Sequence, residues 1–145
     1  MMTEDMSTIG KGTVAQREKK LAQWTLDRYS ECDILIGQNS LAFDRHFLNG
    51  VCFRHQLGLV PKKVRHIDTY QTARGALAMS GSMRNMVDIM GIGTKDAPLK
   101  DDWRNANHGD KEALARIRER CISDVKMTAE MWRRLKPIYV YKWGQ

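Results

Sequence analysis

The segment Asp33-Ile-Leu-Ile-Gly-Gln-Asn-Ser-Leu-Ala-Phe-Asp44 decides the fold of this 145-residue chain. Its apolar run from Asp33 to Gly37 is short and continuous, which predicts a strand covered on both faces, as in a parallel sheet. A polar turn then leads to Asp44 at the expected start of a helix. The segment therefore places a carboxylate at the carboxyl end of a buried strand, where open α/β sheets gather their ligands.

Three residues of this segment are expected to shape the turn. Gly37 lets the chain change direction, and Asn39 can tie the turn through side-chain hydrogen bonds. Phe43 is expected to anchor the start of the helix. For Asp44 itself, the competing interpretation is a first-turn aspartate that the helix dipole favours and that has no chemical role.

Apolar spacing and turn signals predict the remaining elements. Amphipathic helices are expected at 16–29, 43–57, 69–79, 82–90 and 110–135. Gly58 and Pro137 are predicted to end the second and the last of these helices. Residues 64–68 are expected to form the second strand. Residues 91–109 are expected to form a loop, because their apolar residues show no regular spacing.

Caps and apolar faces support two of these assignments. Ser82 and Asp110 are suitable N-caps for the helices that follow them. The first helix is expected to pack through Leu21, Trp24, Thr25 and Tyr29. The last helix is expected to pack through a seam of Leu114, Ile117, Cys121, Val125, Thr128 and Trp132.

The strand–helix–strand–helix order predicts a parallel strand pair joined by a right-handed crossover. Only two strands can be counted, and a two-stranded sheet is marginal in water without further partners or helix cover. We therefore expect an α/β domain over 16–138 with its N-terminal strands missing. Residues 1–15 would be a flexible lead-in and residues 139–145 a tail.

Charge and cysteine usage limit the classes of protein to consider. The net charge of +7 favours a polyanionic partner such as nucleic acid, although many basic proteins are simply soluble. Cys32, Cys52 and Cys121 form no CxxC pair, so we expect buried thiols in a reducing compartment rather than a zinc ribbon or disulfides. No signal-peptide core or bilayer-length apolar run is evident, which predicts a cytoplasmic protein with no membrane partner.

Two further acids could carry chemistry. Asp124 is expected at the edge of the apolar seam of the last helix, where an unpaired aspartate is costly. A bound metal ion or a salt bridge to Arg120 one turn earlier would each explain it. Asp68 ends the second strand and could point to the same edge as Asp44, but we favour its capping the helix that begins at Thr69.

Histidines and basic residues give weaker signals. The four histidines show no HxH or HExxH spacing, so a zinc site is not indicated. Basic residues cluster in several places and could track phosphates, or could be solvated helix faces. The residues that we assign to nucleic-acid contact are Lys62, Lys63, Arg65 and Arg120.

Several motifs resemble those of ribonuclease H-like 3′–5′ exonucleases of the DEDD type, including phage and bacterial members. Ile36-Gly37-Gln38-Asn39 together with Asp44 is similar to the family's G-H-N-x-x-x-F-D motif, and 64–69 looks like its iDT strand end. Residues 109–113 and 120–125 are similar to its closing helix, G-D-x-E-A followed by Y-C-x-x-D-V.

The resemblance implies a partial three-layer ribonuclease H-like fold and hydrolysis of phosphodiesters in DNA or RNA, with single strands expected. In that family four carboxylates hold two divalent ions, Mg²⁺ or Mn²⁺. Asp44 would be the acid of the second motif and Asp124 the last acid. Asn39 and Asp68 would be supporting residues.

The chain also departs from the family pattern. The first motif, D-x-E on an early strand, is absent, and Gln38 replaces the common histidine of the second motif. Arg120 and Glu119 stand at the positions of the usual general-base Tyr and His. Upstream sequence, or a homodimer or second chain that pairs with the exposed strand edge, would have to supply the missing part.

We therefore expect a metal-dependent 3′–5′ exonuclease-like domain whose activity alone is limited by the missing motif. The alternative is a non-catalytic nucleic-acid-binding or oligomerising module derived from such a nuclease.

Overall fold

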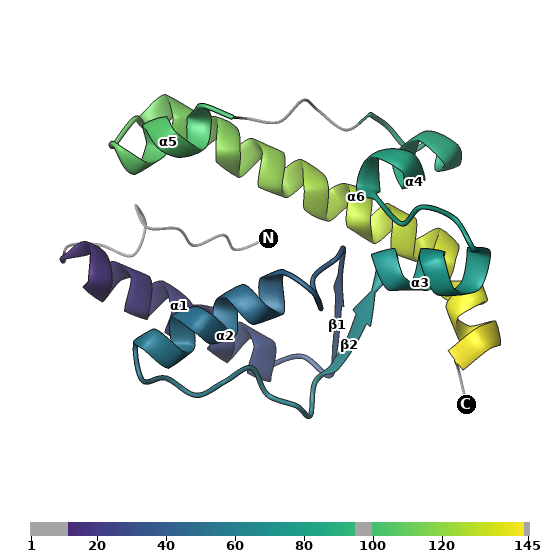
Figure 1. Ribbon diagram of the computed structural model, residues 1–145, viewed down its shortest axis with the longest axis horizontal. Helices are drawn as coiled ribbons and strands as arrows, with labels where there is room; N and C mark the ends of the chain where they lie inside the picture. The colour runs from purple at the N-terminus through teal and green to yellow at the C-terminus, as the bar shows by residue number, and fades with distance from the viewer. Residues whose placement is uncertain (1–11, 95–99, 144–145) are drawn as a thin grey trace. The chain divides into compact units, whose positions relative to one another are not determined.

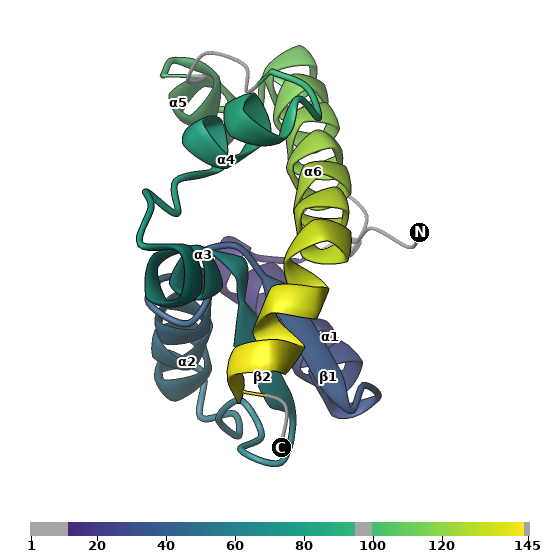
Figure 2. The same cartoon turned by 90° about the vertical axis from the view of Figure 1, so that its right-hand side faces the viewer.

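The computed structural model describes residues 12–94 and 100–143 and is a mostly helical α/β structure with a two-stranded parallel sheet (Figures 1 and 2). Its elements in chain order are α1 (Val14–Ser30), β1 (Ile34–Gly37), α2 (Asp44–Arg54), β2 (Arg65–Asp68), α3 (Thr69–Leu77), α4 (Met83–Met90), α5 (Asp102–Asn107) and α6 (Lys111–Trp143). The chain divides into two compact units, Met1–Asp68 (unit 1) and Thr69–Gln145 (unit 2).

The sheet lies in unit 1 and confirms the predicted parallel pairing. Ile34 of β1 is in register with Arg65 of β2, and Gly37 with Asp68. The expectation of a strand buried on both faces is wrong, because Ile34 is 50% exposed and the rest of β1 is only partly covered. Each strand has one neighbour within the described part of the chain.

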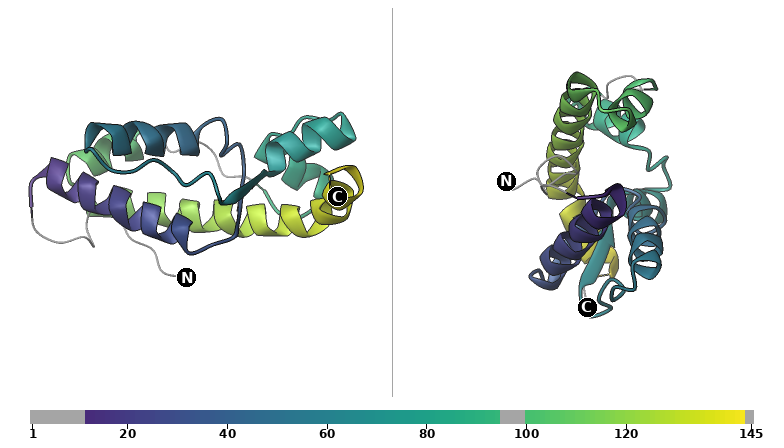
Figure 3. Two further views of the ribbon diagram at one scale, coloured as in Figure 1. Left: turned by 90° about the horizontal axis from the view of Figure 1, so that it is seen from below. Right: turned by 90° about the vertical axis from the view of Figure 1, so that its left-hand side faces the viewer.

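Helices α1 and α2 of unit 1 lie alongside each other (Figure 3) and build its core. The buried residues of this core are Ala22, Leu26, Val51, Cys52 and Val60. The predicted apolar face of α1 is therefore displaced, since Leu21, Trp24 and Thr25 are only half-buried. The small side chain of Ala22 explains the difference, because the side chains at a helix contact set how closely the two axes approach.

The predicted role of Phe43 as an anchor is also wrong. Phe43 and Phe47 are 64% and 68% exposed, and their rings stack on each other with centroids 6.4 Å apart. Positions four residues apart on a helix drift by about 40°. With Val51 and Cys52 facing the core, two such steps turn Phe43 toward solvent.

The end of α2 also differs from its prediction. The helix stops at Arg54 rather than continuing to Gly58. Gln56 adopts the left-handed conformation, with φ of 56°, so the change of direction comes before the glycine.

In unit 2, α3, α4 and α5 pack against the long helix α6. The core is rich in methionine and consists of Ala73, Met83, Met86, Val87, Met127, Met131 and Leu135. Two predicted ends of α4 are confirmed. The Ser82 Oγ accepts a hydrogen bond from the Asn85 N–H at 3.4 Å, and Gly91 ends the helix in the left-handed conformation.

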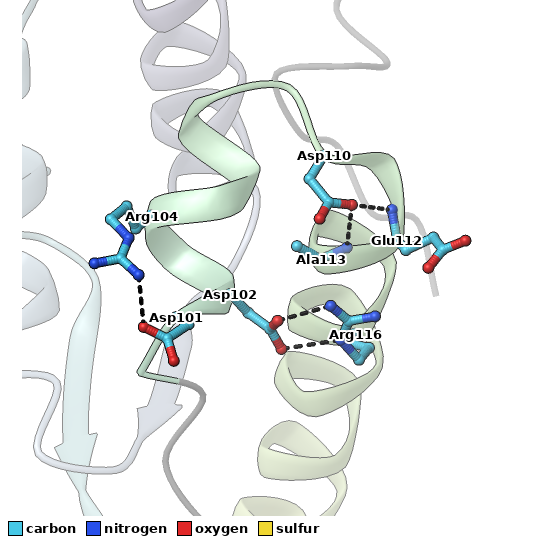
Figure 4. Close-up of polar contacts among 7 residues, drawn as sticks. All are labelled: Asp101, Asp102, Arg104, Asp110, Glu112, Ala113 and Arg116. Atoms are coloured by element: carbon cyan, nitrogen blue, oxygen red, sulfur yellow. Dashed lines mark hydrogen bonds and ion pairs between the residues drawn. The ribbon is translucent and has the colours of Figure 1, made fainter.

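Helix α5 falls inside the stretch predicted as a loop, of which residues 95–99 lie outside the described residues. The helix is held by tertiary contacts that periodicity cannot reveal. The Arg116 guanidinium of α6 donates from Nε and Nη2 to the two carboxylate oxygens of Asp102, at 3.1 and 2.8 Å (Figure 4). The predicted cap of α6 is confirmed, since Asp110 Oδ1 accepts from the N–H groups of Glu112 and Ala113.

Helix α6 does not end at Pro137 as predicted but continues to Trp143. Proline removes one intrahelical hydrogen bond and bends a helix, but it need not end one. The rings of Trp132 and Tyr139 pack edge-on across Pro137, with centroids 5.5 Å apart, which supports the continuing turns. Figure 2 shows the last turns of α6 (yellow) displaced from the line of the preceding ones.

The start of α1 and one of the three cysteines differ from their predictions. Helix α1 begins at Val14, inside the expected lead-in, while residues 1–11 and 144–145 lie outside the described residues. Cys52 is buried and Cys32 is partly buried, but Cys121 is exposed, contrary to prediction. None of the described helices is long and apolar enough to cross a bilayer.

Candidate carboxylate site

The turn between β1 and α2 is fixed to the end of β2 by a buried carboxylate. Asp68, only 3% exposed, accepts hydrogen bonds from the backbone N–H of Asn39 at 2.9 Å and of Leu41 at 3.0 Å. Hydrogen bonds to an ionised carboxylate are stronger than neutral ones. Asp68 therefore holds the turn at the carboxyl edge of the sheet. That it also caps α3 stays a prediction.

The backbone of the turn is specialised in two places. Asn39 adopts φ of 57° and is bonded through its backbone, because its carbonyl oxygen also accepts from the Phe43 N–H at 3.1 Å. The predicted side-chain ties of Asn39 are not found among the described contacts. Gly37 is needed for space rather than for turning, since a Cβ there would collide with the Ser40 side chain.

A serine–histidine contact adds a second fastening of the turn to β2. Ser40 is 5% exposed, and its Oγ lies 2.8 Å from Nε2 of His66. His66 precedes Asp68 by two residues, so both side chains lie on one face of β2. Burial lowers the pKa of His66, with the carboxylates of Asp68 and Asp44 acting in the opposite direction.

Tyr29 of α1 also contacts His66. Its ring meets the His66 ring edge-on, with centroids 6.5 Å apart. Burial raises the pKa of Tyr29, and the nearby Asp44 carboxylate raises it further. The sequence interpretation assigned no site role to Tyr29 or His66, although the two-residue spacing of His66 and Asp68 on a strand could have identified the histidine.

Asp44 is the first residue of α2, as predicted, and it is exposed. Partial desolvation raises the pKa of the Asp44 carboxyl, and repulsion from the Asp68 carboxylate raises it further. A hydrogen bond from its own backbone N–H and the proximity of His66 act in the opposite direction. Two carboxyl groups therefore influence each other at one edge of the sheet, and a bound cation would relieve their repulsion.

Asp124 lies on α6 in unit 2, nearer the packed face of the helix than predicted. The buried residues Ile117, Met127 and Met131 lie at spacings that place Asp124 on the same face, where it is half-buried. The predicted seam was rotated, because it ran through Cys121 and Val125, which are exposed. That Asp124 joins Asp44 at one ion stays a prediction.

The basic residues assigned to nucleic acid occupy different surroundings. Lys62 and Lys63 are exposed and precede β2, so they lie at the opposite end of that strand from Asp68. Arg65 is exposed on β2 itself, whereas Arg120 is half-buried on α6. The acidic edge and the lysine pair are therefore separate features of unit 1.

The donor types at the acidic edge suit a hard cation, but their number is small. Carboxylate oxygens are the ligands that Mg²⁺ and Mn²⁺ prefer. The described residues contain no cluster of three or more His, Cys, Asp or Glu suited to holding a metal ion. Mg²⁺ commonly keeps several waters and uses one or two carboxylates together with substrate phosphates, and Asp44 fits that manner of binding.

Comparison of the chain with protein-family models, with curated proteins and with solved structures finds no match.

Proposed function

We propose that the chain is a divalent-metal-dependent nuclease domain of the ribonuclease H-like 3′–5′ exonuclease type, acting on nucleic acid phosphodiesters. One observation carries the proposal. Asp44 presents an exposed carboxylate near that of Asp68 at the carboxyl edge of a parallel strand pair, where a cation would relieve the repulsion between the two acids.

The residues of unit 1 divide the work between binding and positioning. Asp44 would hold Mg²⁺ or Mn²⁺, and Asp124 of α6 is the second ligand that the motifs imply. When bound, such an ion activates a water and stabilises the leaving 3′-oxygen. Asp68 accepts hydrogen bonds from backbone N–H groups of the turn, and the Ser40–His66 contact holds the same turn against β2. These residues therefore position the start of α2.

The net charge of +7 supports a nucleic-acid substrate. Mg²⁺ bound by two carboxylates depends on the phosphates of the substrate for further ligands. We therefore expect weak ion binding by the chain alone and stronger binding with a strand present. Full turnover would need carboxylates equivalent to the D-x-E motif, from further sequence or from a second chain.

The test is shortening of a 5′-labelled single-stranded oligonucleotide, DNA or RNA, in Mg²⁺ or Mn²⁺. We expect a ladder of products shortened from the 3′ end, which Asp44→Asn and Asp124→Asn each abolish. Asp88→Asn, which changes an exposed acid on α4, should leave the ladder intact. Cleavage that survives both Asp44→Asn and Asp124→Asn would exclude the proposed site.

A second candidate function is nucleic-acid binding without turnover. It is favoured by the hydrogen bonds of Asp68, which commit that carboxylate to the turn and leave fewer groups for metal ions. Here we expect salt-sensitive affinity for DNA or RNA and no products. Absence of binding at low salt would reject this version, and a stable oligomer that ignores nucleic acid, seen by light scattering, would favour a scaffold instead.

A further inference from the structure

The methionines of the described part of the chain all lie at the core of unit 2. Four are buried in that core and two are half-buried against it: Met83, Met86, Met127, Met131, Met79 and Met90. The buried core of unit 1 contains no methionine. Thioether sulfur is therefore concentrated in one of the two units.

Exposure divides these methionines into a rim and an interior. Met86 and Met131, the interior pair, are 1% and 0% exposed. Met79 and Met90, the rim pair, are half-buried. A small oxidant dissolved in water therefore reaches the rim pair in the folded protein, whereas it reaches the interior pair only when the core opens.

The rim pair lies where three helices of unit 2 meet. Met79 lies in the connection between α3 and α4, and Met90 is the last residue of α4. Both side chains pack against the buried core, and Arg134 of α6 donates a hydrogen bond to the carbonyl oxygen of Met90. A chemical change in either side chain therefore acts on the packing of α3 and α4 against α6.

The thioether of methionine reacts with peroxides. The sulfur lone pair attacks one oxygen of hydrogen peroxide, so that an S–O bond forms while the O–O bond breaks. The second oxygen takes up the proton left on the first and leaves as water. The sulfur loses two electrons and the peroxide gains them, and a flexible apolar side chain becomes a polar sulfoxide.

The core of unit 2 is poorly suited to hold a sulfoxide. Besides methionine, its buried members are Ala73, Val87 and Leu135, whose side chains have no hydrogen-bond donor. A polar oxygen without a donor is costly in such surroundings. A sulfoxide at Met79 or Met90 therefore favours contact with water over contact with the core.

We propose that the methionine core of unit 2 is an oxidation site, at which peroxide converts Met79 and Met90 to sulfoxides and thereby loosens α3 and α4 from α6. Methionine also fills irregular cores with no further role, but that role does not require a half-buried pair at the rim. Methionine sulfoxide reductases reverse the oxidation, so the loosening is reversible. The proposal uses none of the acids of the proposed function and is independent of it.

The experiment treats the full chain with hydrogen peroxide, locates each sulfoxide by peptide mass spectrometry and measures the urea midpoint by circular dichroism. We expect the rim pair to gain oxygen before Met86 and Met131, and the urea midpoint to fall as the rim pair is oxidised. Methionine sulfoxide reductases A and B should restore the midpoint. Oxidation of the interior pair as fast as the rim pair, or an unchanged midpoint after oxidation of the rim pair, would overturn the proposal.

Variants identify the source of the change. Met79→Leu/Met90→Leu keeps the apolar volume and removes the rim sulfur atoms, so peroxide should no longer lower its urea midpoint. The matched control Met86→Leu/Met131→Leu should still show the fall. So should Cys121→Ser, which removes an exposed thiol that peroxide also oxidises. A fall that persists in Met79→Leu/Met90→Leu, or that disappears in Cys121→Ser, would reject the rim methionines as its cause.

Discussion

At the scale of single residues, Asp68 is the side chain on which the site depends most. It is 3% exposed and accepts two backbone hydrogen bonds from the turn that leads to Asp44. Asp68→Ala leaves both N–H groups without this acceptor, so we expect a loss of about 1–3 kcal/mol in the free energy of unfolding. Asp68→Asn keeps one acceptor oxygen and should cost less. Urea unfolding measures both, and an alanine variant as stable as the unaltered protein would contradict this role.

Asp44 gives a prediction of opposite sign. Its pKa is raised in the folded chain above the ordinary 3.8, so the folded state binds the proton more tightly than the unfolded state. Stability therefore falls as pH rises from the unfolded to the folded pKa, and the cost is fully present at neutral pH. Asp44→Asn should raise the urea midpoint at neutral pH, and the gain should vanish below both pKa values. A variant less stable than the original at neutral pH would be inconsistent with a destabilised carboxylate.

His66 provides a second dependence on pH in the same cluster. Burial lowers its pKa from the ordinary 6.5, so the unfolded state binds the proton more readily. The contribution of the neutral His66 side chain to stability is fully present above pH 6.5 and is lost as the pH falls through the folded-state pKa. His66→Gln, which keeps a polar group near Ser40, should remove this decline. An unchanged pH profile of the urea midpoint would show that His66 is not its source.

Sequence predicted correctly the residues whose position depends on turn and capping chemistry. It failed for residues whose contacts and burial depend on packing. The position of Asp44 at a helix start and the cap at Asp110 follow from turn and capping chemistry, and both are confirmed. The contact of Ser40 with His66 depends on strand register, which no local pattern contains. Phe43 was expected to anchor the start of the helix, but it is exposed because Val51 and Cys52 are the residues of α2 that face the core.

At the scale of elements, Pro137 makes the clearest prediction. The proline is exposed within α6, removes a backbone donor and can clash with the preceding turn. Pro137→Ala restores the hydrogen bond without losing buried surface, so unit 2 should gain up to about 3 kcal/mol and the helical circular dichroism should increase. Lys136→Ala, at the neighbouring exposed position, is the control. A destabilised Pro137→Ala variant would mean that the bend itself is needed.

Elements supported by local signals were predicted and those supported by tertiary contacts were not. Both strands and the starts of α4 and α6 follow from apolar runs and caps, and the structure contains them. Helix α5 is only six residues long, which is too short to show a regular spacing of apolar residues. Its contact with α6 through Asp102 and Arg116 cannot be seen in the local sequence. The continuation of α6 past Pro137 likewise depends on the packing of Trp132 and Tyr139.

At the scale of the whole molecule, the chain consists of two units, each with its own small core. The boundary falls between Asp68 and Thr69, where no Pro-, Gly- or Ser-rich linker marks it in the sequence. The count of two strands, by contrast, followed directly from the apolar runs and holds within the described residues. The proposed metal ligands, Asp44 and Asp124, come from different units. A test of whether they bind one ion must therefore use the complete chain.

Mn²⁺ binding to the full chain, measured by electron paramagnetic resonance with a single-stranded oligonucleotide present, tests the proposed carboxylate site most directly. We predict one tight class of bound Mn²⁺ that Asp44→Asn and Asp124→Asn each weaken at least about tenfold, with the double variant little worse than either single one, because the two groups share an ion. Mn²⁺ binding that is absent, or that persists unchanged in Asp44→Asn, would contradict the proposed site.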